Sequence, residues 1–311
     1  MKIAVTSRSF SRNETLRAEL ASALPKASFL FNEEGKVLSG DLLISFLAGA
    51  RAAIIGLEKI DGSILARLPE LKLISKYGVG TDGLDLGALK KHGVELAWKG
   101  GVNRRSVAEL TLAMMLTLVR GLGDYPRSIP AGSWAKKPGR QLTGKTVGII
   151  GLGNIGKDLV SLLRPFGCTI LANDLLDFSE FCTAHGVRQT DFETVLRESD
   201  IVTLHVPLTD LTRGFIDKRA LALMKREAYL INTARGGIVE ETALKDALRA
   251  GRLAGAALDV FDVEPPADRE LLSLPTLFST PHIGGSSEEA VLAMGRAAIE
   301  GLATNLRRNG A

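Results

Sequence analysis

Three polar residues lie where short apolar runs end, and together they could bind a small acid and move a proton. Arg235 stands in INTARGG, Glu264 in LDVFDVEPP and His282 in FSTPHIGG. Each apolar run is typical of a parallel strand, and the carboxyl ends of parallel strands gather at the edge where α/β folds bind ligands. A guanidinium can hold a carboxylate by two hydrogen bonds, and an imidazole exchanges protons near neutral pH. The set therefore predicts chemistry on a small anionic acid.

The segment TVGIIGLGNIG has the spacing of a strand, turn and helix that bind a dinucleotide. Gly151 would permit the tight turn, Gly153 would let the backbone approach a pyrophosphate, and Gly156 would let helix and strand pack closely. The amino terminus of the helix, which includes Asn154 and Ile155, would then face the phosphate charge. Because glycine turns also join strands to helices where no ligand binds, this motif alone is weak support.

A second feature in register with this motif is Asp174, which ends the next apolar run, TILAND, 18 residues beyond Gly156. A carboxylate at that place would bond the ribose hydroxyls and repel a 2′-phosphate. The two features together predict NAD rather than NADP. The alternative interpretation is a structural glycine turn with an aspartate that caps a helix.

Each catalytic candidate also has a plain structural alternative. Arg235 could be a surface charge at a strand end, Glu264 a turn residue before two prolines, and His282 a loop histidine. Taken singly, these alternatives are as reasonable as a catalytic role. The ordered occurrence of all three favours the catalytic interpretation.

The elements that must position these residues are parallel strands that alternate with helices. Short apolar runs bounded by turn residues predict strands in both halves of the chain. In the first half, strands are expected at residues 2–7, 27–31, 52–56, 71–77 and 94–98. After residue 145, strands are expected at residues 146–151, 169–174, 201–206, 228–233, 255–260 and 277–280. This alternation predicts parallel sheets covered by helices.

Polar residues before apolar stretches mark where helices begin. Helix starts are predicted at Asn13, Asp61, Asp85, Asp191, Asp217 and Glu240, and a final helix at about residues 287–307. The helix that begins at Asp61 is expected to end at Pro69. A long helix from residue 103 or 106 to Val119 is apolar nearly all round, so it must be buried between layers, domains or subunits. Residues 121–145 show no period and are predicted to form an extended connection or arm.

Composition argues against several classes of protein. The net charge of +4 over 311 residues is small and no basic run is longer than a pair, so we expect no nucleic-acid partner. The two cysteines, Cys168 and Cys182, cannot form a disulfide framework, and the first residues lack a signal pattern, so we expect a cytoplasmic protein. The apolar run at residues 110–119 is shorter than the roughly 20 residues that span a bilayer, so we expect no membrane segment.

Taken together, GLGNIG, Asp174, HVPLT, INTARGG, ALDVFDVEPP and TPHIGG resemble the D-isomer-specific 2-hydroxyacid dehydrogenases, most closely the phosphoglycerate dehydrogenase-like branch. The likeness covers nearly the whole chain, including YGVGTDGLDL and SVAELTLAMML in its first half. It implies an α/β protein of two Rossmann-like, doubly wound parallel-sheet domains. Residues 1–99 and 286–311, from both chain ends, would form a flavodoxin-like substrate-binding domain, and residues 100–285 an NAD-binding Rossmann domain. It also implies a homodimer, formed through the helix near 103–120 and the arm after it.

The resemblance implies a role for each candidate residue. Arg235 would hold the substrate carboxylate and carbonyl, His282 would be the acid and base, and Glu264 would be its partner. Asp259 would bond the nicotinamide carboxamide, with capping of the following turn as the alternative. His205 would lie near the cofactor without being catalytic. The predicted cofactor contacts are Gly151, Gly153, Asn154, Ile155, Gly156, Asp174, His205, Val206, Pro207, Thr233, Ala234, Arg235, Asp259, His282 and Gly284.

Substrate contacts are predicted in both domains, and no metal is expected. In KYGVG, two backbone amides could form a nest for the substrate carboxylate, with Lys76 adding positive charge; a glycine turn without a ligand is the alternative. Many relatives have arginine where this chain has Lys76, so the identity of the 2-hydroxy acid stays open. The predicted substrate-binding residues are Lys76, Tyr77, Gly78, Val79, Arg235 and His282.

The predicted function is hydride transfer between NAD and a small anionic D-2-hydroxy acid or 2-keto acid of the phosphoglycerate, glycerate/hydroxypyruvate or glyoxylate type. The alternative is an NAD(H)-sensing, corepressor-like binding protein, because one fold can carry either function. Formate dehydrogenases resemble this chain but have glutamine in place of Glu264, so they are disfavoured. Because the chain stops at residue 311, we expect no added regulatory domain.

Overall fold

The computed structural model describes residues 1–308 and divides the chain into two compact units. The first comprises Met1–Asn103 and Gly285–Ala311, and the second comprises Arg104–Gly284. The first unit is therefore formed from both ends of the chain, as the predicted fold required. Residues 309–311 of the predicted segment 286–311 lie outside the described residues.

In its described part, the first unit holds a five-stranded parallel sheet with the order β2-β1-β3-β4-β5. Its strands are β1 (Lys2–Val5), β2 (Ser28–Phe31), β3 (Ala52–Ile55), β4 (Leu73–Lys76) and β5 (Glu95–Ala97). Each of them falls inside a predicted range. This strand order is the flavodoxin-like one, in which the direction of winding reverses between β1 and β3.

Helices cover this sheet, and the last of them comes from the far end of the chain. The helices are α1 (Arg8–Ser11), α2 (Glu14–Ala23), α3 (Gly40–Leu47), α4 (Gly62–Leu65), α5 (Leu86–Lys91) and α14 (Glu288–Arg308). As predicted, the side chains of Asn13, Asp61 and Asp85 cap α2, α4 and α5. The prediction that α4 reaches Pro69 is wrong, because the helix ends at Leu65 and only turns follow it.

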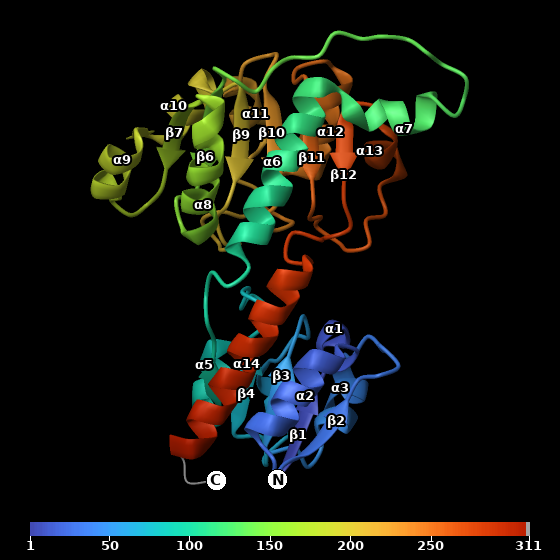
Figure 1. Cartoon of the computed structure of the whole chain (residues 1–311), viewed down its shortest axis with the longest axis vertical. Coiled ribbons are helices and arrows are strands. Elements are labelled where there is room, and N and C mark those ends of the chain that lie inside the picture. Colours follow the sequence, from blue (N-terminus) through green and yellow to red (C-terminus); the bar gives the residue numbers. More distant parts are fainter. Residues whose placement is uncertain (309–311) are drawn as a thin grey trace. The chain divides into compact units, whose positions relative to one another are not determined.

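Helix α14 is part of the core of the first unit. It packs against α2, β4 and β5 (Figure 1), and its buried residues Met294, Ala298 and Leu302 share a cluster with Ile3 of β1. The side chain of Ser287 accepts a hydrogen bond from the amide of Ala290 at 3.2 Å, so the predicted start of this helix is confirmed. The chain end thus contributes an apolar face that the first sheet needs for burial.

The described residues of the second unit form a seven-stranded parallel sheet with the order β12-β11-β10-β9-β6-β7-β8. Its strands are β6 (Thr146–Ile150), β7 (Thr169–Asn173), β8 (Val187–Gln189), β9 (Ile201–Leu204), β10 (Tyr229–Asn232), β11 (Gly255–Leu258) and β12 (Leu277–Ser279). Counted from β6, this is the doubly wound dinucleotide-binding order with one further strand. The prediction of two Rossmann-like parallel-sheet domains is confirmed. Strand β8 was not predicted, because its three residues at the sheet edge include Arg188 and Gln189 and form no apolar run.

Two layers of helices flank the seven-stranded sheet. The helical segments are α6 (Arg104–Arg120), η1 (Leu122–Asp124), α7 (Tyr125–Ser128), α8 (Asn154–Leu163), η2 (Arg164–Phe166), α9 (Ser179–His185), α10 (Phe192–Glu198), α11 (Lys218–Leu223), α12 (Glu241–Arg249) and α13 (Arg269–Ser273). The prediction that residues 121–145 form an extended connection is wrong at their start, where η1 and α7 form. Gly121 has a φ of 61° and turns the chain, and Pro126 lies in the first turn of α7, where proline is favoured.

The long helix α6 is buried within the second unit. It packs against α8 and against β10 and β11, and Ala108, Met114 and Met115 are fully buried in the same cluster as Ile149 and Ile231. The predicted burial of this helix is therefore satisfied between layers. Over residues 1–308, no helix combines the length and the apolarity that crossing a membrane requires.

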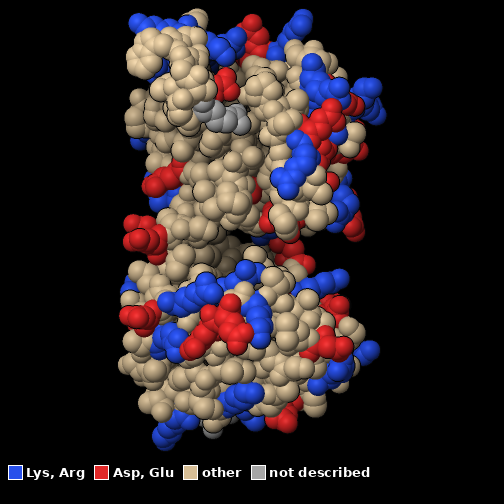
Figure 2. Space-filling model, turned by 90° about the vertical axis from the view of Figure 1, so that its right-hand side faces the viewer, with Lys and Arg blue, Asp and Glu red and all other residues tan. Residues whose placement is uncertain are grey.

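Charged side chains on the surface pair locally. On the face shown in Figure 2, basic and acidic side chains are interspersed. Arg296 binds Glu19 at 2.8 Å, and Arg308 binds Glu95 at 2.9 Å. Exposed pairs of this kind contribute little to stability, so each unit is held together mainly by its own buried apolar clusters.

The packing of α8 on β6 generates a stability prediction. A Cβ at Gly156 would lie 2.3 Å from the carbonyl oxygen of Gly151, whereas a Cβ at Gly153 would have nothing within 4 Å. We expect Gly156→Ala to lower the free energy of unfolding by roughly 1 to 3 kcal/mol. Gly153→Ala should change it by less than about 0.5 kcal/mol. Urea denaturation of both variants measures the difference, and equal effects would contradict the close helix–strand contact.

Candidate functional site

The residues singled out in the second half of the chain all lie at the carboxyl edge of the seven-stranded sheet. Gly151 follows β6, Asp174 follows β7, His205 follows β9 and Thr233 follows β10, while Asp259 follows β11. His282 lies two residues after Thr280, which follows β12. Parallel strands therefore bring together residues that are separated by up to 131 positions in the sequence (282 − 151 = 131).

The glycine loop has the geometry of a phosphate cradle. Gly151 has a φ of 97°, and a Cβ there would lie 2.5 Å from the carbonyl oxygen of His205. Gly153 precedes α8 and is exposed, with open space where a side chain would be. Asn154 and Ile155 form the first turn of this ten-residue helix. The loop thus leaves room for an anion at an exposed helix amino terminus, which suits a pyrophosphate.

Asp174 is hydrogen-bonded to the backbone on both sides. Its Oδ2 accepts a hydrogen bond from the amide of Leu152 at 2.7 Å, and its Oδ1 accepts one from the amide of Leu176 at 2.9 Å. The carboxylate therefore also fixes the glycine loop, a role that the sequence did not reveal. Beside it, Leu175 is 90% exposed and Leu176 is 65% exposed. These side chains give the edge an apolar surface next to the carboxylate, which fits a nucleoside.

His205 is a neutral histidine beneath the glycine loop. Its backbone amide donates to the carbonyl of Ile150 at 2.7 Å, and its Nε2 lies 3.1 Å from Oγ1 of Thr203. Although part of the residue is accessible, Nδ1 is buried and has no hydrogen-bond partner among the described residues. Desolvation lowers the pKa of His205 from 6.5 to about 3. The ring is therefore uncharged at neutral pH, and the exposed Pro207 and half-buried Val206 follow it.

The loop that follows β10 is held by hydrogen bonds to side chains. Oγ1 of Thr233 lies 2.9 Å from Oγ1 of Thr111 in α6, and both residues are buried. Asn232 accepts from the amide of Ala234 at 3.0 Å and donates to the carbonyl of Arg235 at 2.8 Å. Arg235 itself donates from Nη1 to the carbonyl of Ala234 at 2.6 Å. These bonds fix the backbone that carries Arg235.

Asp259 anchors the segment that carries the histidine. It is 1% exposed, and its Oδ1 accepts from Oγ1 of Thr280 at 2.6 Å and from the amide of Ile283 at 2.8 Å. Its Oδ2 accepts from the amide of Gly284 at 2.8 Å, and its carbonyl accepts from the amide of His282 at 2.9 Å. The structure thus supports the turn-capping interpretation of Asp259. The predicted contact with a nicotinamide stays a prediction.

Glu264 and His282 form a hydrogen-bonded pair. Nδ1 of His282 lies 2.7 Å from Oε2 of Glu264, and each side chain is 37% exposed. Oε1 of Glu264 accepts from the amide of Phe261 at 3.2 Å, which orients the carboxylate. No described residue bonds Nε2 of His282. The histidine therefore presents one nitrogen for proton exchange while the carboxylate holds the other.

The predicted substrate residues of the first unit lie at the end of β4. Lys76 is only 6% exposed, and its Nζ donates to the carbonyls of Gly56 at 2.5 Å and Tyr77 at 3.1 Å. Gly78 has a φ of 107°, and the carbonyl of Val79 accepts from Nε1 of Trp98 at 2.9 Å. Lys76 therefore ties together the loops after β3 and β4, which the prediction of a substrate-facing charge did not include.

Tyr77 is buried at the same edge of the first unit. Its hydroxyl accepts a hydrogen bond from Oγ of Ser9 at 2.9 Å, and its ring meets Phe10 edge to face at 5.8 Å. Burial raises the pKa of Tyr77. The hydroxyl is therefore protonated at neutral pH.

Several residues that position the site carried no sequence signal strong enough to single them out. A Cβ on Gly236 would lie 1.9 Å from the carbonyl oxygen of Phe261, so only glycine lets the loops after β10 and β11 pass so closely. The amide of Gly237 donates to Oδ1 of Asp262 at 2.6 Å and joins the same loops. Thr111 and Thr280 act through single hydroxyl groups. Their partners are 122 and 21 positions away, so no local pattern marks them. Among residues 1–308, no cluster of His, Cys, Asp and Glu is arranged to hold a metal ion.

Comparison with known proteins agrees with this geometry. Residues 112–284 match the sequence model of a family described as D-isomer specific 2-hydroxyacid dehydrogenase, NAD binding domain. That segment covers more than half of the chain. The chain belongs to this family. Its second unit contains the NAD-binding domain, and NAD is the cofactor that the family description names.

Relatives and solved structures of the family match both units. The chain is 41% identical to a D-3-phosphoglycerate dehydrogenase of Bacillus subtilis over 75% of this chain and 45% of the relative. It is 39% identical to a hydroxypyruvate reductase of Thermotoga maritima over 78% of this chain and 80% of the relative. The structure of a D-lactate dehydrogenase from Aquifex aeolicus complexed with NAD and lactic acid matches with a TM-score of 0.84 and 26% identity, covering all of this chain and 96% of that one. This chain spans about half the length of the phosphoglycerate dehydrogenases it matches.

The neutral state of His205 predicts a pH dependence of stability. In the unfolded chain this histidine takes up a proton near pH 6.5, whereas the folded state excludes it down to about pH 3. The unfolded state therefore binds more protons in that window, and stability falls as the pH falls. Between pH 7 and pH 5 we expect the wild type to lose about 2 kcal/mol more than His205→Gln.

Urea denaturation at the two pH values measures this difference. His185→Gln, at an exposed helix end, controls for the loss of a histidine. If wild type and His205→Gln lose equal stability between pH 7 and pH 5, His205 is not buried in its neutral form.

Proposed function

We propose that this protein is an NAD-dependent D-2-hydroxyacid dehydrogenase that interconverts a small anionic 2-hydroxy acid and its 2-keto acid. The observation that carries the proposal is the His282–Glu264 pair, with 2.7 Å between Nδ1 and Oε2 and no described partner on Nε2. Substrates of the phosphoglycerate, glycerate/hydroxypyruvate or glyoxylate type are supported by the names of the relatives. The fold and the motifs do not narrow the identity of the acid further.

Each member of the predicted set has a distinct task in the proposed reaction. NADH supplies the hydride that reduces the carbonyl carbon. As negative charge develops on the carbonyl oxygen, Nε2 of His282 donates the proton that completes the hydroxyl group. Glu264 holds Nδ1 and so fixes the orientation of the ring, which leaves Nε2 for the proton exchange. In the oxidation direction the neutral ring accepts the hydroxyl proton.

Arg235 is the proposed anchor of the substrate. A guanidinium binds a carboxylate through two parallel hydrogen bonds and also stabilises negative charge on the neighbouring carbonyl oxygen. Bonds from Asn232 and to Ala234 fix its backbone and one of its nitrogens, so little freedom is lost when a substrate binds. The buried Lys76 supports the loop that is proposed to contact the rest of the substrate, from Tyr77 to Val79.

The proposed cofactor contacts follow the carboxyl edge of the second sheet. The open helix start at Gly153 would take the pyrophosphate, and Asp174 would take the ribose diol. The loop from His205 to Pro207 and the loop from Thr233 to Arg235 would line the path toward the nicotinamide. Gly284, in the segment that carries His282, would line the end of this path.

A homodimer is the proposed assembly. It would form through α6 and the arm at residues 121–145. The arm carries apolar side chains on its surface: Leu122 is 45% exposed, Ile129 is 49% exposed and Trp134 is 80% exposed. A second copy of the chain would cover them. The corepressor-like alternative gains no support, because the matched relatives are named dehydrogenases and reductases.

The catalytic assignment is tested by following NADH oxidation with hydroxypyruvate, glyoxylate, phosphohydroxypyruvate, oxaloacetate and 2-ketoglutarate. We expect turnover of at least one of these acids, and a fall in kcat of about 10²- to 10⁴-fold in His282→Ala because the proton donor is removed. Glu264→Gln should cause a smaller fall, since it keeps a hydrogen bond but removes the charge. His185→Ala should retain full activity. An absence of turnover despite NADH binding would refute the proposal that the protein is a dehydrogenase. Full activity of His282→Ala would refute the assignment of His282 as the proton donor.

The cofactor assignment is tested at Asp174. Because its carboxylate would repel a 2′-phosphate, Asp174→Asn should reduce the preference for NAD over NADP in kcat/KM by at least about tenfold, equivalent to about 1.4 kcal/mol. Asp177→Asn is the matched control, since Asp177 is exposed and its carboxylate caps Ser179. An unchanged ratio in Asp174→Asn would mean that this carboxylate does not contact the ribose.

A further inference from the structure

The second unit has a pocket at the amino-terminal edge of its sheet, opposite the edge that carries the candidate site. It has a volume of about 370 Å³. Lys145 precedes β6, Asp200 precedes β9 and Tyr229 begins β10, so the starts of three neighbouring strands surround it. Small-molecule sites begin at roughly 300 Å³, and the pocket is therefore large enough for a small organic ligand.

Both carboxylates of the pocket are already paired. Asp200 binds Nζ of Lys225 at 2.8 Å and the amide of Thr146 at 2.9 Å. Burial alone would raise the pKa of Asp200, but these two hydrogen bonds lower it, so the group is ionised and satisfied. Glu227 binds Nη2 of Arg140 at 2.6 Å, and its carbonyl accepts from Nη1 at 3.2 Å. Lys225 and Arg140 are therefore each paired with a carboxylate of the pocket and are not available to pair with an acidic ligand.

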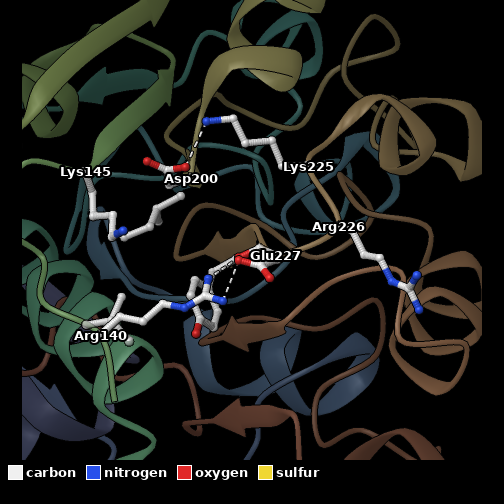
Figure 3. A pocket seen from close by; sticks show the side chains of 9 residues that line it. Arg140, Lys145, Asp200, Lys225, Arg226 and Glu227 are labelled. Atoms are coloured by element: carbon white, nitrogen blue, oxygen red, sulfur yellow. Dashed lines mark hydrogen bonds and ion pairs between the residues drawn. The ribbon is translucent and has the colours of Figure 1, made fainter. Parts of the chain in front are cut away.

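One cation and one hydroxyl group are left over. Among the described residues, no group bonds Nζ of Lys145 or the hydroxyl of Tyr229. Of the four lining cations, Arg226 binds the carbonyl of Gly251 at 3.2 Å. The other three, Arg140, Lys145 and Lys225, exceed the two carboxylates by one charge (3 − 2 = 1). Figure 3 shows Lys145 and Arg140 entering the same part of the pocket, while Arg226 points away from them. The unpaired positive charge therefore lies inside the pocket.

The hydroxyl of Tyr229 is a hydrogen-bond donor beside this charge. Burial raises the pKa of Tyr229, so its hydroxyl keeps its proton at neutral pH. Arg140 and Tyr229 line the same pocket. The apolar side chains of Val119 and Ile201 also line the pocket. A ligand would thus meet a cation, a donor and an apolar surface together.

We propose that this pocket binds a small phosphorylated organic molecule. Its phosphate would lie between Lys145 and the hydroxyl of Tyr229, and its carbon skeleton would contact Val119 and Ile201. A phosphate monoester carries about −1.5 to −2 charges at pH 7 and three acceptor oxygens, which match the spare cation and the donors. Arginine binds carboxylate or phosphate through its planar fork, whereas lysine binds phosphate as a point charge. Because Glu227 already occupies the fork of Arg140, Lys145 is the cation left for a phosphate. The site lies apart from the proposed reaction and does not depend on it.

Calorimetric titration with glycerol 3-phosphate tests this site. The protein is first saturated with NADH and oxalate, so that the candidate cofactor and substrate sites are filled. We expect one saturable site with a dissociation constant of about 0.1 to 1 mM. Lys145→Met should weaken binding about tenfold, and Tyr229→Phe, which removes only a hydroxyl group, about threefold. Lys218→Met, a substitution of an exposed lysine at the start of α11, should leave the affinity unchanged.

Two further ligands separate the chemistry of the anion from that of the carbon skeleton. Inorganic phosphate should bind more weakly than glycerol 3-phosphate, and malonate should bind more weakly than either. Tighter binding of malonate would overturn the assignment of a phosphate. If inorganic phosphate bound as tightly as glycerol 3-phosphate, the proposed contact with the ligand's carbon skeleton would be wrong. The proposal fails as a whole if no saturable binding occurs up to about 10 mM, or if Lys145→Met and Lys218→Met change the affinity equally.

Discussion

A buried carboxylate, Asp259, holds the part of the protein on which the proposed chemistry depends. It accepts hydrogen bonds from Thr280, Ile283 and Gly284, and its carbonyl accepts one from His282. His282 has a φ of 54°, a conformation that few residues other than glycine adopt. Such a conformation persists only where the surroundings impose it. The bonds to Asp259 supply that constraint, and they direct the imidazole toward Glu264.

Neighbouring loops at the carboxyl edge of the second sheet approach one another closely along their backbones. Gly236 lets the loop after β10 pass against Phe261, and Gly151 lets the glycine loop pass against His205. A side chain at either position would collide with a carbonyl oxygen. Neighbouring strands thus deliver their loops in contact with one another, and hydroxyl groups such as that of Thr111 lock them in place. Many polar groups at the carboxyl edge of the second sheet thus have hydrogen-bond partners within the fold.

Most strands of both sheets could be predicted because buried parallel strands are short apolar runs between turn residues. Asn13, Asp61 and Asp85 likewise marked their helices, since a capping side chain acts on amides only two or three residues away. β8 was missed because an edge strand needs no continuous apolar run. The start of the arm was also missed. Its short helices depend on a single turn at Gly121 and on Pro126, which are too few residues to show a period.

The sequence by itself determined the order of the elements, the family, and the types of residue at the candidate site, because each of these depends on neighbours along the chain. Only the tertiary structure decided what those residues contact. Lys76 also binds two carbonyls, Asp174 also holds the glycine loop, and the carboxylate of Asp259 holds the histidine segment. The charged pocket around Lys145 likewise arises only when three strands lie side by side. Hydrogen bonds and burial join residues that are far apart in the sequence, and no local pattern specifies such partners.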